Sequence, residues 1–125
     1  MSATLRALVA AVLLILSPLA ALAHEPRKGP NGGALVDAGS YHIEVIGKGA
    51  TLDVLVSDLN DKPLPATGFK ALAILVVDGK THRVTLEPTP DGSRLTGTTP
   101  VALQAVKGAV QLTDHAGKTA TGRVN

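Results

Sequence analysis

Hydrophobic and polar residues alternate with a period of two along much of the chain after residue 33. The stretch SYHIEVI places Tyr41, Ile43 and Val45 on one side of an extended strand, and the stretch TLDVLVSD repeats this pattern. Such alternation is typical of a strand that turns one face toward the core. The short GKG segment at residues 47–49 predicts a hairpin turn between the two strands.

Two further strand pairs follow along the chain. The segment 70–88, KALAILVVDGKTHRVTLEP, predicts two strands joined at Asp78 and Gly79, a dipeptide that strongly favours a hairpin turn. The first of these strands is apolar on both faces, which indicates a central position in the sheet. The segment 108–124 predicts another hairpin around DHAGK, and GALVD and SRLTG predict shorter strands. PVALQAVKGA is bracketed by Pro100 and Gly108 and predicts at most about one helical turn.

About seven or eight short strands at intervals near a dozen residues predict an all-β domain. We expect a single small antiparallel β-sandwich of immunoglobulin-like type over residues 34–125. The prolines of DKPLPATG, residues 61–68, cannot donate hydrogen bonds to a ladder, so they predict a crossing loop or a protected edge. The predicted core is aliphatic and consists of Ile43, Val45, Leu52, Val54, Leu72, Ile74, Val76, Val84, Leu86 and Leu112.

The first 23 residues read as a signal peptide that is cleaved. Arg6 supplies a positive charge, residues 7–16 form an uninterrupted apolar run, and Ala21-Leu22-Ala23 is a small-x-small cleavage site. The run is short for a bilayer span and no second one follows, so we expect no membrane anchor after cleavage. The prediction is an exported, soluble periplasmic protein with an N-terminal leader at residues 24–33.

Composition narrows the chemistry of any site. The chain has no cysteine, and its one methionine is Met1, which leaves with the signal peptide. Disulfides, thiol catalysis and a Cu(I) site built on sulfur are therefore excluded, whereas nitrogen and oxygen donors suit Cu(II), Zn(II), Ni(II) or Co(II). The net charge is only +2 and the aromatic residues are Tyr41 and Phe69, which excludes a nucleic-acid surface. No serine has a nucleophile-elbow context, so we expect neither an enzyme nor an organic cofactor.

His24 is the first candidate metal ligand. After cleavage it would carry the free α-amine, and the amine and the ring nitrogen could chelate one ion as a pair. Pro26 has no amide proton, so wrapping of deprotonated backbone amides around the ion would stop at Glu25. The alternative is that the leader is a disordered segment with no ligand role.

His42 and Glu44 are two residues apart on a predicted strand and share one face, with Cα atoms roughly 7 Å apart. They could hold a divalent ion together, or they could form a weak pair on a wetted edge strand. His82 is in phase with Val84 and reads as a partly buried residue at a strand end. His115 lies in a predicted turn and reads as solvated.

One segment resembles a known family. GPNGGALVDAGSYHIEVI, residues 29–46, is similar to part of the N-terminal domain of periplasmic adaptor subunits of heavy-metal resistance-nodulation-division efflux pumps, and to related short stand-alone periplasmic proteins. VSDLNDKPLP, followed by an alternating strand, extends the resemblance. The leader of that family is often rich in histidine, so the resemblance implies metal handling. Here Lys28 and Asn31 stand where related leaders often have histidine.

A second resemblance is to small periplasmic copper carriers, which share an immunoglobulin-like sandwich and a mature N-terminal histidine but have a late His-x-His pair that this chain lacks.

These observations lead to two functional hypotheses. The first is a non-enzymatic periplasmic accessory protein that binds one divalent heavy-metal ion in metal efflux or tolerance, through His24, His42 and Glu44. It would work beside a periplasmic efflux component. The second is a metal-free module that docks on another envelope protein, with an apolar strip such as Leu55 and Leu64 exposed.

Overall fold

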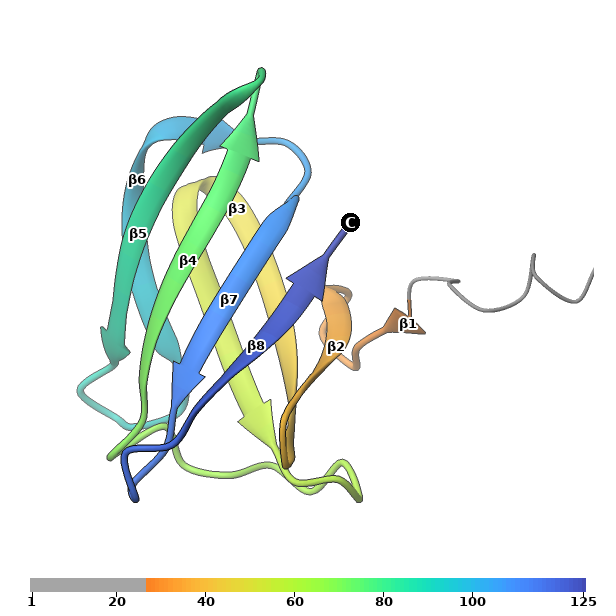
Figure 1. The fold of residues 1–125 in the computed structure, drawn as a ribbon, viewed down its shortest axis with the longest axis vertical. Helices are drawn as coiled ribbons and strands as arrows, with labels where there is room; N and C mark the ends of the chain where they lie inside the picture. Colours follow the sequence, from red (N-terminus) through yellow and green to blue (C-terminus); the bar gives the residue numbers. More distant parts are fainter. Residues whose placement is uncertain (1–26) are drawn as a thin grey trace, which may run out of the picture.

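In the computed structural model, residues 27–125 are described and form eight strands without a helix (Figure 1). The predicted all-β fold of antiparallel strands is therefore confirmed. The predicted signal peptide and His24 lie outside the described residues. The strands are β1 (Arg27–Lys28), β2 (Ala34–Ala38), β3 (Tyr41–Ser57), β4 (Lys70–Val77), β5 (Lys80–Pro88), β6 (Leu95–Leu103), β7 (Gly108–Thr113) and β8 (Thr119–Val124).

The strands pair in the order β1-β2-β3-β6-β5-β4-β7-β8, and every pair is antiparallel. The result is one curled sheet, because β5 pairs with β4 along its length and with β6 at Glu87 and Pro88. β2 and β8 approach each other across the open side, where a Cβ on Gly122 would lie 3.0 Å from the Asp37 carbonyl oxygen. The sheet thus encloses its core as a half-barrel, while the immunoglobulin-like arrangement stays a prediction.

The long strand β3 doubles back on itself. Fifteen extended residues would separate His42 from Ser57 by roughly 50 Å, yet the Ser57 hydroxyl donates to the His42 carbonyl oxygen at 3.4 Å. The ribbon reverses at its upper end (Figure 1), near Gly49, which has a φ of 59°. The hairpin predicted for residues 47–49 is therefore confirmed.

The core is aliphatic, and the structure corrects one part of the predicted set. Seven of the ten predicted core residues are buried: Ile43, Val45, Leu52, Val54, Val84, Leu86 and Leu112. The other three, Leu72, Ile74 and Val76, face outward, and β4 buries Ala71, Ala73 and Leu75 instead. The strand is apolar on both faces, so its alternation does not identify the inner face. The register with β5 pairs Ala71 and Ala73 with the buried Leu86 and Val84, which places both alanines inside.

The turns and connections of the structure match most of those predicted from the sequence. Asp78 and Gly79 have φ values of 51° and 76°, as a tight hairpin turn requires, and β4 lies centrally between β5 and β7. The prolines of residues 61–68 lie in the connection from β3 to β4, where Ser57 and Pro63 form an isolated bridge. The helical turn allowed after Pro100 does not form, because β6 extends to Leu103. Within residues 27–125 no helix has the length and hydrophobicity to cross a membrane.

Candidate functional site

The glycine-rich leader folds into a tight turn against β3. The Gly29 amide donates to the Gly33 carbonyl oxygen at 2.8 Å, and the Gly32 amide donates to the Gly29 carbonyl oxygen at 3.0 Å. Gly32 has a φ of 82°, which glycine adopts without strain. Arg27 and Lys28 precede the turn and form the short strand β1 against β2, which the sequence pattern did not predict.

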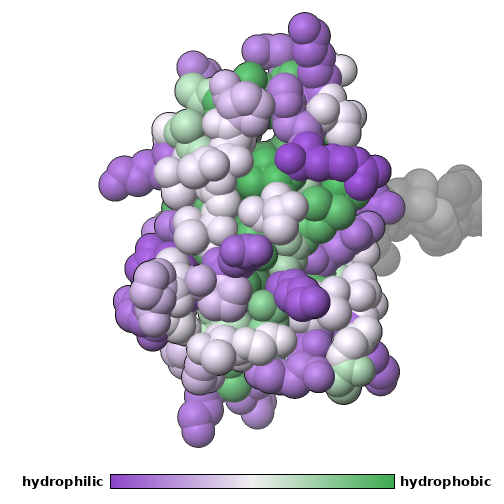
Figure 2. Space-filling model, turned by 90° about the vertical axis from the view of Figure 1, so that its left-hand side faces the viewer, coloured by the Kyte–Doolittle hydropathy of each residue, from purple (hydrophilic) through white to green (hydrophobic). Residues whose placement is uncertain are grey.

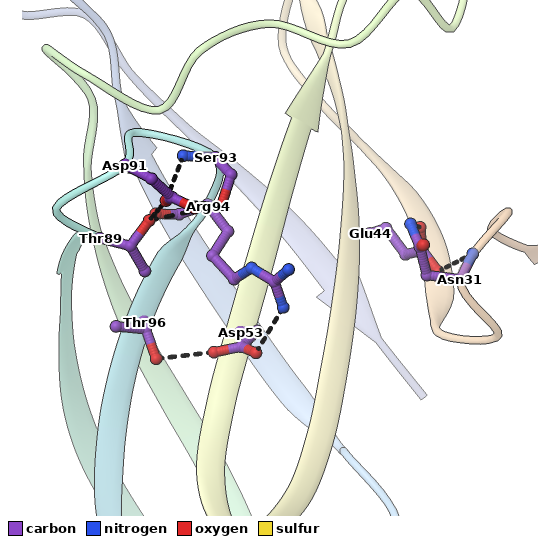
Figure 3. Close-up of polar contacts among 8 residues, drawn as sticks. All are labelled: Asn31, Glu44, Asp53, Thr89, Asp91, Ser93, Arg94 and Thr96. Carbon is purple, nitrogen blue, oxygen red and sulfur yellow. Dashed lines mark hydrogen bonds and ion pairs between the residues drawn. The ribbon is translucent and has the colours of Figure 1, made fainter.

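This turn closes over the Glu44 carboxylate. The Asn31 amide donates to Glu44 Oε2 at 2.9 Å and the Asn31 side chain donates to Oε1 at 3.0 Å (Figure 3). The Gly33 amide donates to Oε2 at 2.8 Å. Glu44 is only 2% exposed. A Cβ on Gly29 would overlap the Glu44 side chain, so the close approach requires glycine there. Three convergent donors compensate the buried charge and hold the leader in place.

His42 lies on the same face of β3 but has different partners. Its Nδ1 is 2.7 Å from Asp61 Oδ1 and its Nε2 is 3.2 Å from Asp37 Oδ1, while its side chain is 12% exposed. A neutral imidazole carries one N–H, so both contacts are hydrogen bonds only when the ring is protonated. Arg27 Nη2 also contacts Asp37 Oδ1 at 2.7 Å, which ties β1 to this corner.

Asp37 and Asp61 reach His42 by different routes. The hairpin between β2 and β3 pairs Asp37 directly with His42. Asp61 comes from the turn after β3, where it has a φ of 62° and its amide donates to the Asp58 carbonyl oxygen at 3.0 Å. A positive φ outside glycine is sparsely populated, although aspartate tolerates it better than most residues. The turn thus holds the Asp61 carboxylate at the imidazole.

A shallow groove of about 400 Å³ runs between the leader turn and the loop that carries Asp61. Its floor is partly apolar, and Glu44 and Asp61 both line it. The residues of the groove wall and floor are Lys28, Pro30, Asn31, Leu35, Glu44, Leu55, Val56, Ser57, Asp61 and Pro63. The groove therefore brings together the leader, the strand of the predicted ligands and a carboxylate that sequence reasoning missed.

The predicted ligands do not converge on one point among the described residues. Glu44 is engaged by the leader, His42 lies between two aspartates, and His24 is outside the described residues. Within residues 27–125 no group of three or more histidine, aspartate or glutamate side chains is arranged to hold a metal ion. His82 is half-buried on the inner face of β5, and the His115 ring Nε2 lies 2.8 Å from the Thr67 carbonyl oxygen, far along the chain from His42.

A second polar cluster lies at the turn between β5 and β6 (Figure 3). The Asp91 carboxylate accepts hydrogen bonds from the Thr89 hydroxyl at 2.6 Å and from the Ser93 amide and hydroxyl at 3.0 and 2.8 Å. These bonds, that of Thr89 foremost, lower the pKa of Asp91 to about 2. Asp53 nearby accepts from Arg94 and Thr96. The polar groups of this cluster are hydrogen-bonded to one another, so the cluster stabilises the turn.

Asp114 ties the last hairpin to β3. It accepts from the amides of Lys118 at 2.9 Å and Ala116 at 3.0 Å, and from the Tyr41 hydroxyl at 3.2 Å. The bond from the Lys118 amide leads the causes that lower the pKa of Asp114. Burial, and then the Asp114 charge, raise the pKa of Tyr41, so the phenol keeps its proton and donates.

Asp114→Asn is expected to give a pH-dependent loss of stability. Because the pKa of Asp114 is lower in the folded chain, its contribution is present above the ordinary aspartate range and is lost as the pH falls through the folded value. The difference in Tm between the variant and the unchanged chain should be largest near pH 7 and shrink as the pH falls below the ordinary aspartate range. Asp78→Asn, in an exposed turn, is the control, and a Tm difference independent of pH would contradict the assignment.

Comparison of the chain with protein-family models, with curated proteins and with solved structures gives no match.

Proposed function

We propose that this chain is a non-enzymatic periplasmic accessory protein that binds one divalent heavy-metal ion, Cu(II), Zn(II), Ni(II) or Co(II), in metal efflux or tolerance. The observation that carries the proposal is the pair formed by His42 Nδ1 and Asp61 Oδ1, which lie 2.7 Å apart. Asp61 of this pair also lines the groove. Two ligand atoms on one such ion lie roughly 3.0 to 3.5 Å apart. A small opening of this pair would therefore admit an ion.

The ligand set proposed here differs from the one suggested by spacing alone. Glu44 has three hydrogen-bond donors from the leader, so its use as a ligand would release the leader turn. Asp61 has no lysine or arginine partner among the described residues, whereas Asp37 is paired with Arg27. Asp61 is thus the better carboxylate, and Asp37 serves to fix β1.

The leader is the proposed source of the remaining donors. β1 begins at Arg27, whose guanidinium reaches the Asp37 carboxylate, and that carboxylate is 3.2 Å from His42 Nε2. Two residues, Glu25 and Pro26, lie between His24 and Arg27, and a step of three positions along the chain spans at most about 10 Å. The α-amine and ring of His24 would then complete a site of four donors with His42 and Asp61, a number typical of Zn(II) and Cu(II).

Calorimetric titration of the chain that begins at His24 tests this proposal. We expect one Zn(II), Cu(II) or Ni(II) ion to bind with a Kd of about 1 μM or tighter, which requires several convergent ligands. His24→Ala, His42→Ala and Asp61→Asn should each weaken binding by at least about tenfold, because each removes one donor.

Two matched controls make the titration specific. Asp78→Asn changes an exposed aspartate that also has a positive φ, and His82→Asn removes an imidazole elsewhere in the sheet. Neither should change the Kd. Binding that is equally strong in all five variants, or no binding near 1 μM, would reject the proposal.

A further inference from the structure

The outward face of β4 carries an apolar stripe without a covering element among the described residues. Leu72 and Ile74 are half-buried and Val76 is 39% exposed. In Figure 1, β5, β4, β7 and β8 form the layer nearest the viewer, and no other described element lies in front of it. Figure 2 looks from the β5 and β6 side, not onto this face, and shows hydrophobic surface there between strongly hydrophilic groups.

The strand register places two arginines on either side of this stripe. Ile74 is paired with Arg83 on β5 and with Ala109 on β7, and Ala109 is paired with Arg123 on β8. Arg83, Ile74, Ala109 and Arg123 therefore form one row across four strands. Both arginines are exposed, and neither has a carboxylate within 4.0 Å among residues 27–125.

The neighbouring rows of the face are polar but nearly free of acidic groups. Thr85, Leu72, Gln111 and Thr121 form the adjacent row toward the β4 start. Among the outward residues of these four strands the one carboxylate is that of Glu87, which lies beside Lys70 at the end of the face. The face is thus apolar in the middle and positive on both flanks, a composition suited to an acidic, amphipathic partner.

The distance between Arg83 and Arg123 indicates which kind of partner fits between them. Three strand spacings place the Cα atoms of Arg83 and Arg123 about 14 Å apart. An α-helix with its side chains is about 10–12 Å wide, so a helix laid along the stripe would fit between the arginines. Its apolar stripe would cover Leu72, Ile74 and Val76, and carboxylates on both of its flanks would reach the guanidiniums.

We propose that the outward face of β4, flanked by Arg83 and Arg123, docks an amphipathic helix of another protein that carries acidic residues on both sides of its apolar stripe. The apolar and the charged contacts contribute differently. The stripe buries apolar surface that the fold leaves in water. The arginines select for negative charge and for the orientation of the helix. Helix docking does not rest on metal binding, because no residue of β4, β5, β7 or β8 lines the groove.

A synthetic helix provides the test. An 18-residue peptide would carry leucine at helical spacing and glutamate on both flanks, and a second peptide would carry lysine in place of glutamate. We expect the acidic peptide to bind the chain comprising residues 24–125 with a Kd of about 10–100 μM by fluorescence anisotropy, a range typical of a small surface. The lysine peptide should bind at least about tenfold more weakly.

Two variants and a control locate the binding face. The affinity for the acidic peptide should fall by at least about tenfold in two variants. One combines Arg83→Glu with Arg123→Glu, and the other is Ile74→Asp. Lys48→Glu combined with Lys62→Glu makes the same change of charge at exposed positions outside the four strands of the face and should have little effect. Thermal melting of each variant checks that the fold is retained, so that lost binding reports the face itself.

Four outcomes would overturn the inference. The acidic peptide fails to bind at 1 mM, or it binds the arginine variants as well as the unchanged chain. Vesicles of anionic lipid bind with the same dependence on Ile74 and the arginines, which would make the occupant a membrane surface. Sedimentation shows a dimer that Ile74→Asp dissociates, which would make the occupant a second copy of this chain.

Discussion

Gly108→Ala is expected to lower the free energy of unfolding by about 3–4 kcal/mol, the range of the most damaging single substitutions. Gly108 begins β7 with a φ of 140°, and a Cβ there would overlap the carbonyl oxygen of Ile74 on β4. The contact is with backbone, so no side chain can rotate away to relieve it. β7 would have to move from β4, which breaks hydrogen bonds of the ladder between these two strands.

Thermal unfolding measures this effect directly. For a domain of this size about 1 kcal/mol corresponds to roughly 4–8 °C, so we expect the Tm to fall by about 15–25 °C. Gly117→Ala is the matched control, because Gly117 also has a positive φ, of 80°, but no heavy atom lies within 4 Å of the place that a Cβ would occupy. In the control, backbone strain should lower the free energy of unfolding by only about 1 kcal/mol. Equal losses in the two variants would show that the close contact with Ile74 does not matter.

The same strand pair shows what the sequence predicts well and what it does not. Alternation and the Asp78-Gly79 turn are local signals, and they identified β4, β5 and their hairpin within a residue or two. The inner face of β4 is not a local property, because both faces are apolar. Ala71 and Ala73 lie inside because the register pairs them with buried residues of β5 and β7, and that register depends on the whole sheet.

Some contacts of the candidate site could be predicted from the sequence, and others could not. Spacing along β3 correctly placed His42 and Glu44 on one face. Asp37 lies opposite His42 because the turn between β2 and β3 consists of Gly39 and Ser40, a register that the alternation of the strands does not define. Asp61 reaches His42 from a turn 19 residues away, and no local pattern indicates such a contact.

The sequence of the leader predicts only part of its structure. Its glycines are typical of a turn, and the structure has a turn at Gly29–Gly33. The sequence did not indicate that the turn closes on Glu44, because the three donors are backbone and amide groups that many loops could offer. A buried carboxylate beside a glycine-rich loop is therefore compatible with a ligand role and with a structural one until the hydrogen bonds are known.

Glu44→Ala is expected to release the leader and to lower the free energy of unfolding by about 2–4 kcal/mol. The variant removes three hydrogen bonds to a charged acceptor, which are stronger than bonds between neutral groups. Water replaces the acceptor for the freed amides of Asn31 and Gly33, which limits the loss. Urea denaturation measures the free energy of unfolding. Trypsin cleavage after Arg27 or Lys28 reports how readily the leader detaches, and it should be at least about tenfold faster in the variant.

Two further variants separate the charge of Glu44 from its shape. Glu44→Gln keeps the length of the side chain but turns one acceptor into a donor that faces the leader amides, so an intermediate loss is expected. Glu87→Ala removes an exposed glutamate and should change stability by less than about 0.5 kcal/mol. If Glu44→Ala left both stability and cleavage unchanged, the leader would not depend on this carboxylate. Glu44 would then be free to join His42 as a ligand, and the proposed ligand set would have to include it in place of Asp61.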